Sequence, residues 1–214
     1  MAQGIKSFFP SIGSKFNSCH DNLGQFCSGG SGFINKVSVD TETTNEEFAK
    51  QQINDYLTDI PESIQKESSI KTLEVFENPE DATYRMQELH GKWIIDEDEL
   101  IRGAYDRDTR KAIVSLYYAD DAYLEVSGMD SSDLAYSGRN FYHEFAHSLE
   151  NKITSNSWGS AWHEWDLDQD EGFATAFASY MVGKRLARLG SKEELKNFKT
   201  NYPKTTEVFR KWGM

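Results

Sequence analysis

The longest regular stretch of the sequence is a helical pattern that runs from about Asp168 to Leu189. Acidic residues stand at its start and arginines near its end, which suits the helix dipole, and Gly190 follows as a terminator. Its apolar residues recur at helical spacing and are expected to form the buried side: Phe173, Ala174, Phe177, Met181 and Val182. A hydrophobic fraction of 38% also favours a folded core over a disordered chain.

The shorter patterns alternate between helix and strand. Segments rich in β-branched and aromatic residues indicate strands, and capped amphipathic segments indicate helices. The expected elements are a helix over 44–60, a strand at 71–77, a helix over 79–90, a hairpin over 99–118, a helix over 133–152 and two short helices on either side of Pro203. This order predicts one α+β domain over residues 41–214, with a small mixed sheet packed on helices.

Residues 1–40 differ in composition from the rest of the chain. This leader is rich in Ser and Gly, and residues 1–36 carry three lysines but a single acid, Asp21. Such a composition is typical of a flexible tail, and it would also suit a translocation signal or a weak membrane-surface anchor. The leader lacks the pattern of a Sec signal peptide, and no apolar run reaches the roughly 20 residues that cross a bilayer.

Charge and cysteine content limit the partners and the compartment. The net charge of −12 at pH 7 argues against binding of nucleic acid, because an acidic surface repels phosphates. Cys19 and Cys27 are the two cysteines of the chain. The sequence allows either a small disulfide loop between them or two free thiols. The oligomeric state is open as well.

The segment NFYHEFAHSLENK, residues 140–152, holds two of the chain's five histidines. On a helix, residues four apart lie on one face, so His143 and His147 can point at a single metal ion. Glu144 directly follows His143 and lies beside that face of the helix. From there its carboxylate can reach a water on the metal. In zinc hydrolases the metal lowers the pKa of this water to about 7, and the glutamate takes its proton. The motif therefore predicts one zinc ion per chain, with Glu144 as general base.

A catalytic zinc site needs a third protein ligand. The extended motif with a histidine six residues further on is absent, because that position is Ile153. Glu171 stands in the first turn of the predicted long helix, from which its carboxylate can reach a metal held by a neighbouring helix. The expected metal ligands are therefore His143, His147 and Glu171, with a fourth position open.

Three segments resemble a known family: HEFAH at 143–147, EGFATAFASYM at 171–181 and the terminal YPKTTEVFRKW at 202–212. Together they resemble the metalloprotease domain of anthrax lethal factor and the related clostridial Pro-Pro endopeptidases, over about residues 140–214. The resemblance implies a zincin-like fold, in which a small mixed sheet packs on the HExxH helix and on a second helix that carries a glutamate ligand. It also implies a zinc-dependent endopeptidase that hydrolyses peptide bonds in a protein substrate.

The chain departs from that family at the residue that stabilises the oxyanion. The family has a tyrosine seven residues before its glutamate ligand, whereas this chain has Glu164 there and no tyrosine between residues 143 and 179. We predict that His163 takes the oxyanion role, since an imidazole N–H in the same loop can donate to developing negative charge. The alternative is that His163 is an exposed loop residue between Trp162 and Trp165 without a catalytic role.

The strand predicted over residues 111–118 precedes the motif helix and is expected to bind the substrate as an edge strand.

In the absence of a Sec signal peptide, the resemblance implies a bacterial toxin or effector that is secreted or injected into a host cell. The alternatives are a cytoplasmic regulatory or processing protease, and an inactive zincin-like fold used for binding. An inactive fold would hold little zinc and would not depend on Glu144.

Overall fold

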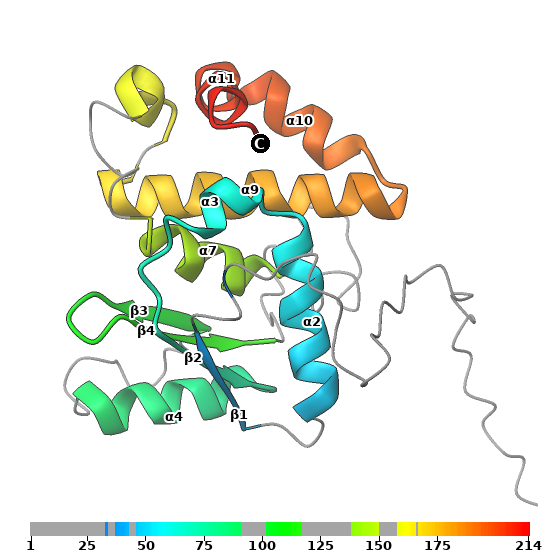
Figure 1. Cartoon of the computed structure of the whole chain (residues 1–214). Coiled ribbons are helices and arrows are strands. Elements are labelled where there is room, and N and C mark those ends of the chain that lie inside the picture. Colours follow the sequence, from blue (N-terminus) through cyan, green and yellow to red (C-terminus); the bar gives the residue numbers. More distant parts are fainter. Residues whose placement is uncertain are drawn as a thin grey trace, which may run out of the picture.

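The computed structural model describes the chain at residue 33 and over residues 37–42, 46–90, 102–116, 138–149, 158–165 and 167–214. These residues form a helix-rich α+β structure with one small mixed sheet (Figure 1). The predicted fold class is confirmed at this level. Predictions that concern residues 1–32, the two cysteines among them, and the helix cap at Thr44 lie outside the described residues.

Four strands make up the sheet, in the order β1 (Ser38–Glu42), β2 (Thr72–Phe76), β4 (Lys111–Ser115) and β3 (Gly103–Asp106). β1, β2 and β4 are parallel, and β3 pairs antiparallel with β4 through the predicted hairpin. β4 is therefore paired on both sides, and the prediction of an edge strand over 111–118 is wrong. Among the described strands, the edges are β1 and β3.

The side chains of β4 explain its place inside the sheet, because they are buried on both faces. Ala112 and Val114 belong to the main core, on the side of α7 (Arg139–His147). Ile113 lies in a second cluster on the opposite face, which α4 (Pro79–His90) covers. A strand covered by helices on both faces is apolar throughout, and such a run does not reveal which strand lies at an edge.

The longest helix, α9 (Gln169–Leu189), lies across α7 on the side away from the sheet (Figure 1). It begins and ends as predicted. The Asp168 side chain accepts hydrogen bonds from backbone N–H groups of the first turn, and Gly190 ends the helix at a φ of 117°. Phe145 of α7 and Phe177 of α9 stack at a centroid distance of 6.0 Å. This packing fixes the start of α9 next to the motif helix.

The remaining helices cover α9 and one end of the sheet. They are α2 (Glu46–Thr58), α3 (Glu62–Gln65), α10 (Glu193–Asn201), α11 (Pro203–Lys211) and a 3-10 helix, η2 (Gly159–Glu164). Figure 1 shows α10 and α11 on the outer side of α9, and the two predicted terminal helices are confirmed. No described helix is long and apolar enough to cross a membrane.

The helix predicted over 133–152 is shorter in the structure. No single helix runs over 133–152, because α7 starts after Gly138, whose left-handed φ of 75° interrupts helical geometry, and ends at His147. The folded domain also begins before residue 41, because Phe33 and Val37 are buried in the core. Residue 33 and residues 37–40 therefore belong to the folded domain.

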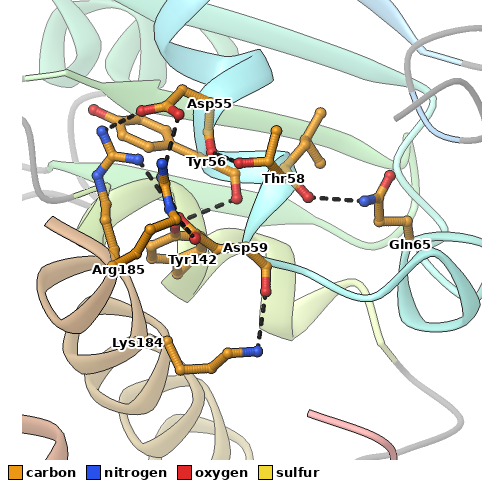
Figure 2. Close-up of polar contacts among 10 residues, drawn as sticks. Asp55, Tyr56, Thr58, Asp59, Gln65, Tyr142, Lys184 and Arg185 are labelled. Carbon is orange, nitrogen blue, oxygen red and sulfur yellow. Dashed lines mark hydrogen bonds and ion pairs between the residues drawn. The ribbon is translucent and has the colours of Figure 1, made fainter. Parts of the chain in front are cut away.

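A buried ionic cluster joins the C-terminal end of α2 to α7 and α9 (Figure 2). Asp59, with 5% of its side chain exposed, accepts a hydrogen bond from Tyr142 Oη at 3.1 Å and pairs with Arg188 Nε at 2.8 Å. Arg185 pairs with Asp55 at 2.6 Å. The cluster therefore fixes α2 against both helices that carry the predicted metal ligands.

On the α4 face of the sheet, Glu74 of β2 lies between two cations. Its carboxylate lies 2.9 Å from Arg85 Nε and 2.5 Å from Lys111 Nζ. Burial raises the pKa of Glu74, but the hydrogen bonds from Arg85 and Lys111 outweigh burial, and the pKa is lowered overall. These pairs therefore stabilise the fold above the unfolded-state pKa, and that stability is lost as the pH falls through the folded-state value.

We expect Glu74→Gln to lower the free energy of unfolding at pH 7 by about 1–2 kcal/mol. The difference from the wild-type protein should shrink as the pH falls below about 4.3, the usual pKa of a glutamate. Urea unfolding at pH 7 and at lower pH measures both effects. The exposed Glu193→Gln control should change stability at pH 7 by less than about 0.5 kcal/mol. An equal loss for Glu74→Gln at every pH would contradict the ionic pairing.

Candidate metal centre

The helix α7 presents His143 and His147 on one face, as their spacing predicts. The two Nε2 atoms lie 3.2 Å apart, and the ring planes make an angle of 75°. Phe141 and Phe145 of the same helix are buried in the core. Core packing thus fixes the rotation of α7 and leaves both imidazoles on its other side.

Glu171 reaches both histidines from the first turn of α9. Its Oε2 lies 3.2 Å from Nε2 of His143, and its Oε1 lies 3.3 Å from Nε2 of His147. The Asp168 side chain accepts a hydrogen bond from the Glu171 backbone N–H at 3.0 Å, which fixes this turn. The structure therefore brings the three predicted ligands together.

The spacing of these three groups fits one metal ion. In tetrahedral coordination with bonds of about 2.0–2.1 Å, two ligand atoms lie about 3.3–3.4 Å apart. The two imidazole Nε2 atoms lie 3.2 Å apart, and they lie 3.2 and 3.3 Å from different oxygens of Glu171. With one ligand atom taken from each residue, the three atoms lie within 4.8 Å of one another. Two imidazole nitrogens and a carboxylate oxygen are also donors that divalent transition metals bind. His143, His147 and Glu171 could therefore hold a metal ion.

The pKa values of Glu171 and His147 are shifted in this group. Hydrogen bonds from His143 and His147 lower the pKa of Glu171 well below its usual range. Burial lowers the pKa of His147, but the hydrogen bond to Glu171 and nearby negative charges outweigh burial, so the pKa is raised. A metal ion must displace such imidazole protons to bind. Metal affinity is therefore expected to weaken as the pH falls.

Glu144 lies beside this group and is almost fully buried, with 5% of its surface exposed. Burial raises the pKa of its carboxyl, while the charges of His143 and His147 lower it in part. A raised pKa suits a carboxylate that must accept a proton near neutral pH and release it again.

The predicted site residues of α7 and α9 line a cavity of about 540 Å³, together with residues of the β3–β4 hairpin. β3 contributes Gly103, Ala104 and Tyr105 to the cavity wall. The hairpin turn contributes Arg107, whose guanidinium pairs with Asp170 of α9 at 2.5 Å. The sequence does not single out the four hairpin residues, because its apolar run favours β4 as the strand beside the site. The sequence feature that could have indicated β3 is its short length together with its glycine, because short strands are common at sheet edges and a strand glycine often marks a close approach.

His163 is not among the described residues that line the cavity. It lies on η2, and its ring packs on Trp162 at a centroid distance of 3.8 Å. The next residue, Glu164, accepts hydrogen bonds from the backbone N–H groups of Lys204 and Thr205 at 3.0 and 2.8 Å. These bonds cap α11 and hold η2 against it, on the outer side of α9 (Figure 1). The predicted oxyanion role of His163 therefore has no support in the described residues.

Comparisons with known proteins do not identify a family for this chain. No protein-family model matches the chain, and a search of curated proteins finds no match. The function has to be inferred from the site itself.

Proposed function

We propose that the chain is a zinc-dependent endopeptidase with a zincin-like fold. The observation that carries this proposal is the convergence of His143 and His147 from α7 with Glu171 from α9, at separations of 3.2 and 3.3 Å. Glu144 lies buried in the same cavity. Two imidazoles and a carboxylate as ligands, with a separate carboxylate as base, are the protein groups that zinc-dependent peptide hydrolysis requires.

His143, His147 and Glu171 would hold the zinc ion. Zinc at such a site supplies Lewis-acid chemistry, which polarises a carbonyl group and lowers the pKa of a water molecule. Glu144 accepts the proton of the attacking water and passes it to the leaving amine. The raised pKa of Glu144 supports this role, because the carboxyl must release the proton it has accepted.

The strand β3 is proposed to bind the substrate, in place of the predicted β4. β3 is an edge of the described sheet, and Gly103, Ala104 and Tyr105 line the cavity. An extended peptide that pairs with this edge would enter the cavity that the metal ligands also line. Such pairing uses main-chain hydrogen bonds and binds many sequences.

The resemblance to the lethal factor domain favours a bacterial toxin or effector that cleaves a host protein. A bacterial regulatory or processing protease would use the same chemistry on a different substrate. The substrate therefore distinguishes these two roles.

Metal analysis of the purified full-length protein tests the proposed site. We expect about one zinc ion per chain, and Glu171→Ala should weaken zinc affinity by more than about 100-fold. The neighbouring Asp170→Asn is the matched control and should keep the zinc, because Asp170 pairs with Arg107. A wild-type protein that binds no zinc, or a Glu171→Ala variant that binds it as tightly as the wild type, would contradict the proposal.

Cleavage is tested by comparing the new protein N-termini that appear in a eukaryotic and in a bacterial lysate. We expect the wild-type protein to generate new termini, and Glu144→Gln or added chelator to prevent them. Termini in the eukaryotic lysate alone would favour an effector, and termini in the bacterial lysate alone a processing protease. A zinc-loaded wild-type protein that generates no termini in either lysate would point to an inactive fold used for binding.

A further inference from the structure

We propose that Gly103 is a positioning residue for Glu144, because the lack of a side chain at position 103 sets where the glutamate carboxyl lies. This inference rests on the proposed function. A Cβ atom at Gly103 would lie 2.8 Å from both Cγ and Oε1 of Glu144, and 3.1 Å from its Cδ. Non-bonded carbon atoms make their best contact at about 3.5–4.0 Å. The Glu144 side chain therefore fills the space that any larger residue at position 103 would need.

Backbone conformation does not explain the glycine. Gly103 pairs with Val114 in the regular register of the β3–β4 hairpin. It has no positive φ, in contrast to Gly138 and Gly190. A glycine within a strand weakens the strand, and it often marks a place where another group approaches closely. Here the approaching group is Glu144.

Hydrogen bonds hold the backbones on both sides of this contact in place. Ser115 donates hydrogen bonds from its N–H and its Oγ to the Arg102 carbonyl, at 2.8 and 2.9 Å. Asn140 Nδ2 donates to the Oγ and the carbonyl oxygen of Ser115, both at 3.0 Å. Arg102 directly precedes Gly103, and Asn140 lies one helical turn before Glu144. These bonds therefore fix the strand and the helix at the point where the glycine faces the glutamate.

Gly103→Ala is expected to displace the carboxyl of Glu144 and leave the metal ligands in place. A misplacement of about 1 Å costs up to roughly 100-fold in rate, so kcat should fall by about 10–100-fold. KM should change less than about threefold, since alanine keeps the main-chain groups of β3 that are proposed to pair with the substrate and ground-state binding does not use the base. Zinc content should equal that of the wild-type protein.

Truncating Glu144 to alanine should relieve the clash, because Glu144→Ala removes Cγ, Cδ and Oε1, the three atoms that a Cβ at position 103 would meet. That change lowers activity by itself, and the informative quantity is the additional effect of Gly103→Ala. We expect Gly103→Ala to cost about 10–100-fold in the wild-type background and less than about threefold in the Glu144→Ala background. A residue that only supports the fold would show equal losses in both backgrounds.

Gly172→Ala provides the matched control, because Gly172 directly follows the ligand Glu171. A Cβ atom there would lie 3.4 Å from Cβ of Trp165 and 3.7 Å from Cβ of Leu167, which are ordinary contacts. Alanine is also the better helix former. We therefore expect Gly172→Ala to keep the wild-type rate and zinc content.

Urea unfolding of the same full-length variants separates this inference from the proposed function. If the wild-type protein cleaves no peptide, the proposed function fails, but the packing of Gly103 against Glu144 is still measurable. We then expect Gly103→Ala to lower the urea midpoint in the wild-type background and not in the Glu144→Ala background. Equal lowering in both would overturn the inference. A Gly103→Ala variant as active as an active wild-type protein would also overturn it and leave the proposed function intact.

Discussion

Replacing the buried Glu144 by glutamine is expected to lower kcat/KM for peptide cleavage by about 10²–10⁴-fold. The amide has nearly the shape of the carboxyl but cannot accept a proton from water. His143, His147 and Glu171 are unchanged in this variant, so zinc content should equal that of the wild type. The rate is measured on a fluorogenic peptide that spans a site cleaved by the wild-type protein.

Two controls separate loss of the base from loss of the fold. Burial raises the pKa of Glu144 and so disfavours its charged form, and the neutral amide is expected to keep or raise the free energy of unfolding. Glu193→Gln makes the same chemical change at an exposed position of α10 and should leave the rate unchanged. A Glu144→Gln protein that folds, holds zinc and keeps the wild-type rate would exclude Glu144 as the general base.

The predicted ligand group could be read from the sequence because each of its signals is local. The spacing of His143 and His147 fixes their shared face wherever a helix forms. Asp168 and Gly190 mark the two ends of α9. Because the helix starts at Asp168, Glu171 is expected in its first turn. Only the meeting of α7 and α9 is a long-range event, and the apolar sides of the two helices make it the expected packing.

The strand beside the site was not predictable in the same way. Strand order in a sheet depends on pairing between distant segments, and the run in β4 fits a central strand as well as an edge strand. The approach of Gly103 to Glu144 depends on that order, because Gly103 belongs to β3, an edge of the described sheet. Hydropathy carries no information on such a contact.

The oxyanion role of His163 stays a prediction, and His163 is not among the described residues that line the cavity. His163 lies eight positions before Glu171, yet η2 is held on the outer side of α9. At the start of α11, about forty residues further on, the backbone N–H groups of Lys204 and Thr205 donate hydrogen bonds to Glu164 and hold η2 there. The residue at the family's tyrosine position therefore caps a helix in this chain.

The ionic cluster around Asp59 is expected to contribute more stability than the exposed ion pairs of the chain (Figure 2). Exposed pairs such as that of Lys66 and Glu62 contribute about 0–1 kcal/mol, because water and salt screen them. Asp59 and Arg185 have 5% and 6% of their side chains exposed. Burial and the charge of Asp59 raise the pKa of Tyr142, so the Tyr142 hydroxyl stays protonated and donates to Asp59.

Asp59→Asn is therefore expected to lower the free energy of unfolding by about 3 kcal/mol, since removal of one buried charge leaves its partners uncompensated. The loss should lie at the lower end of the range for buried pairs. Arg185 keeps its contact with Asp55 at 2.6 Å, and 41% of the Arg188 side chain is exposed. Urea unfolding at pH 7 measures the change.

Asp108→Asn removes the same charge from an exposed turn and should change stability by less than about 0.5 kcal/mol. A second comparison uses Arg188→Gln with and without Asp59→Asn. Because Asp59 and Arg188 are in direct contact, the two single losses should sum to more than the loss in the double variant. Equal losses for Asp59→Asn and Asp108→Asn would show that the cluster does not hold α2 on α7 and α9, and strictly additive losses would show that Arg188 is not its partner.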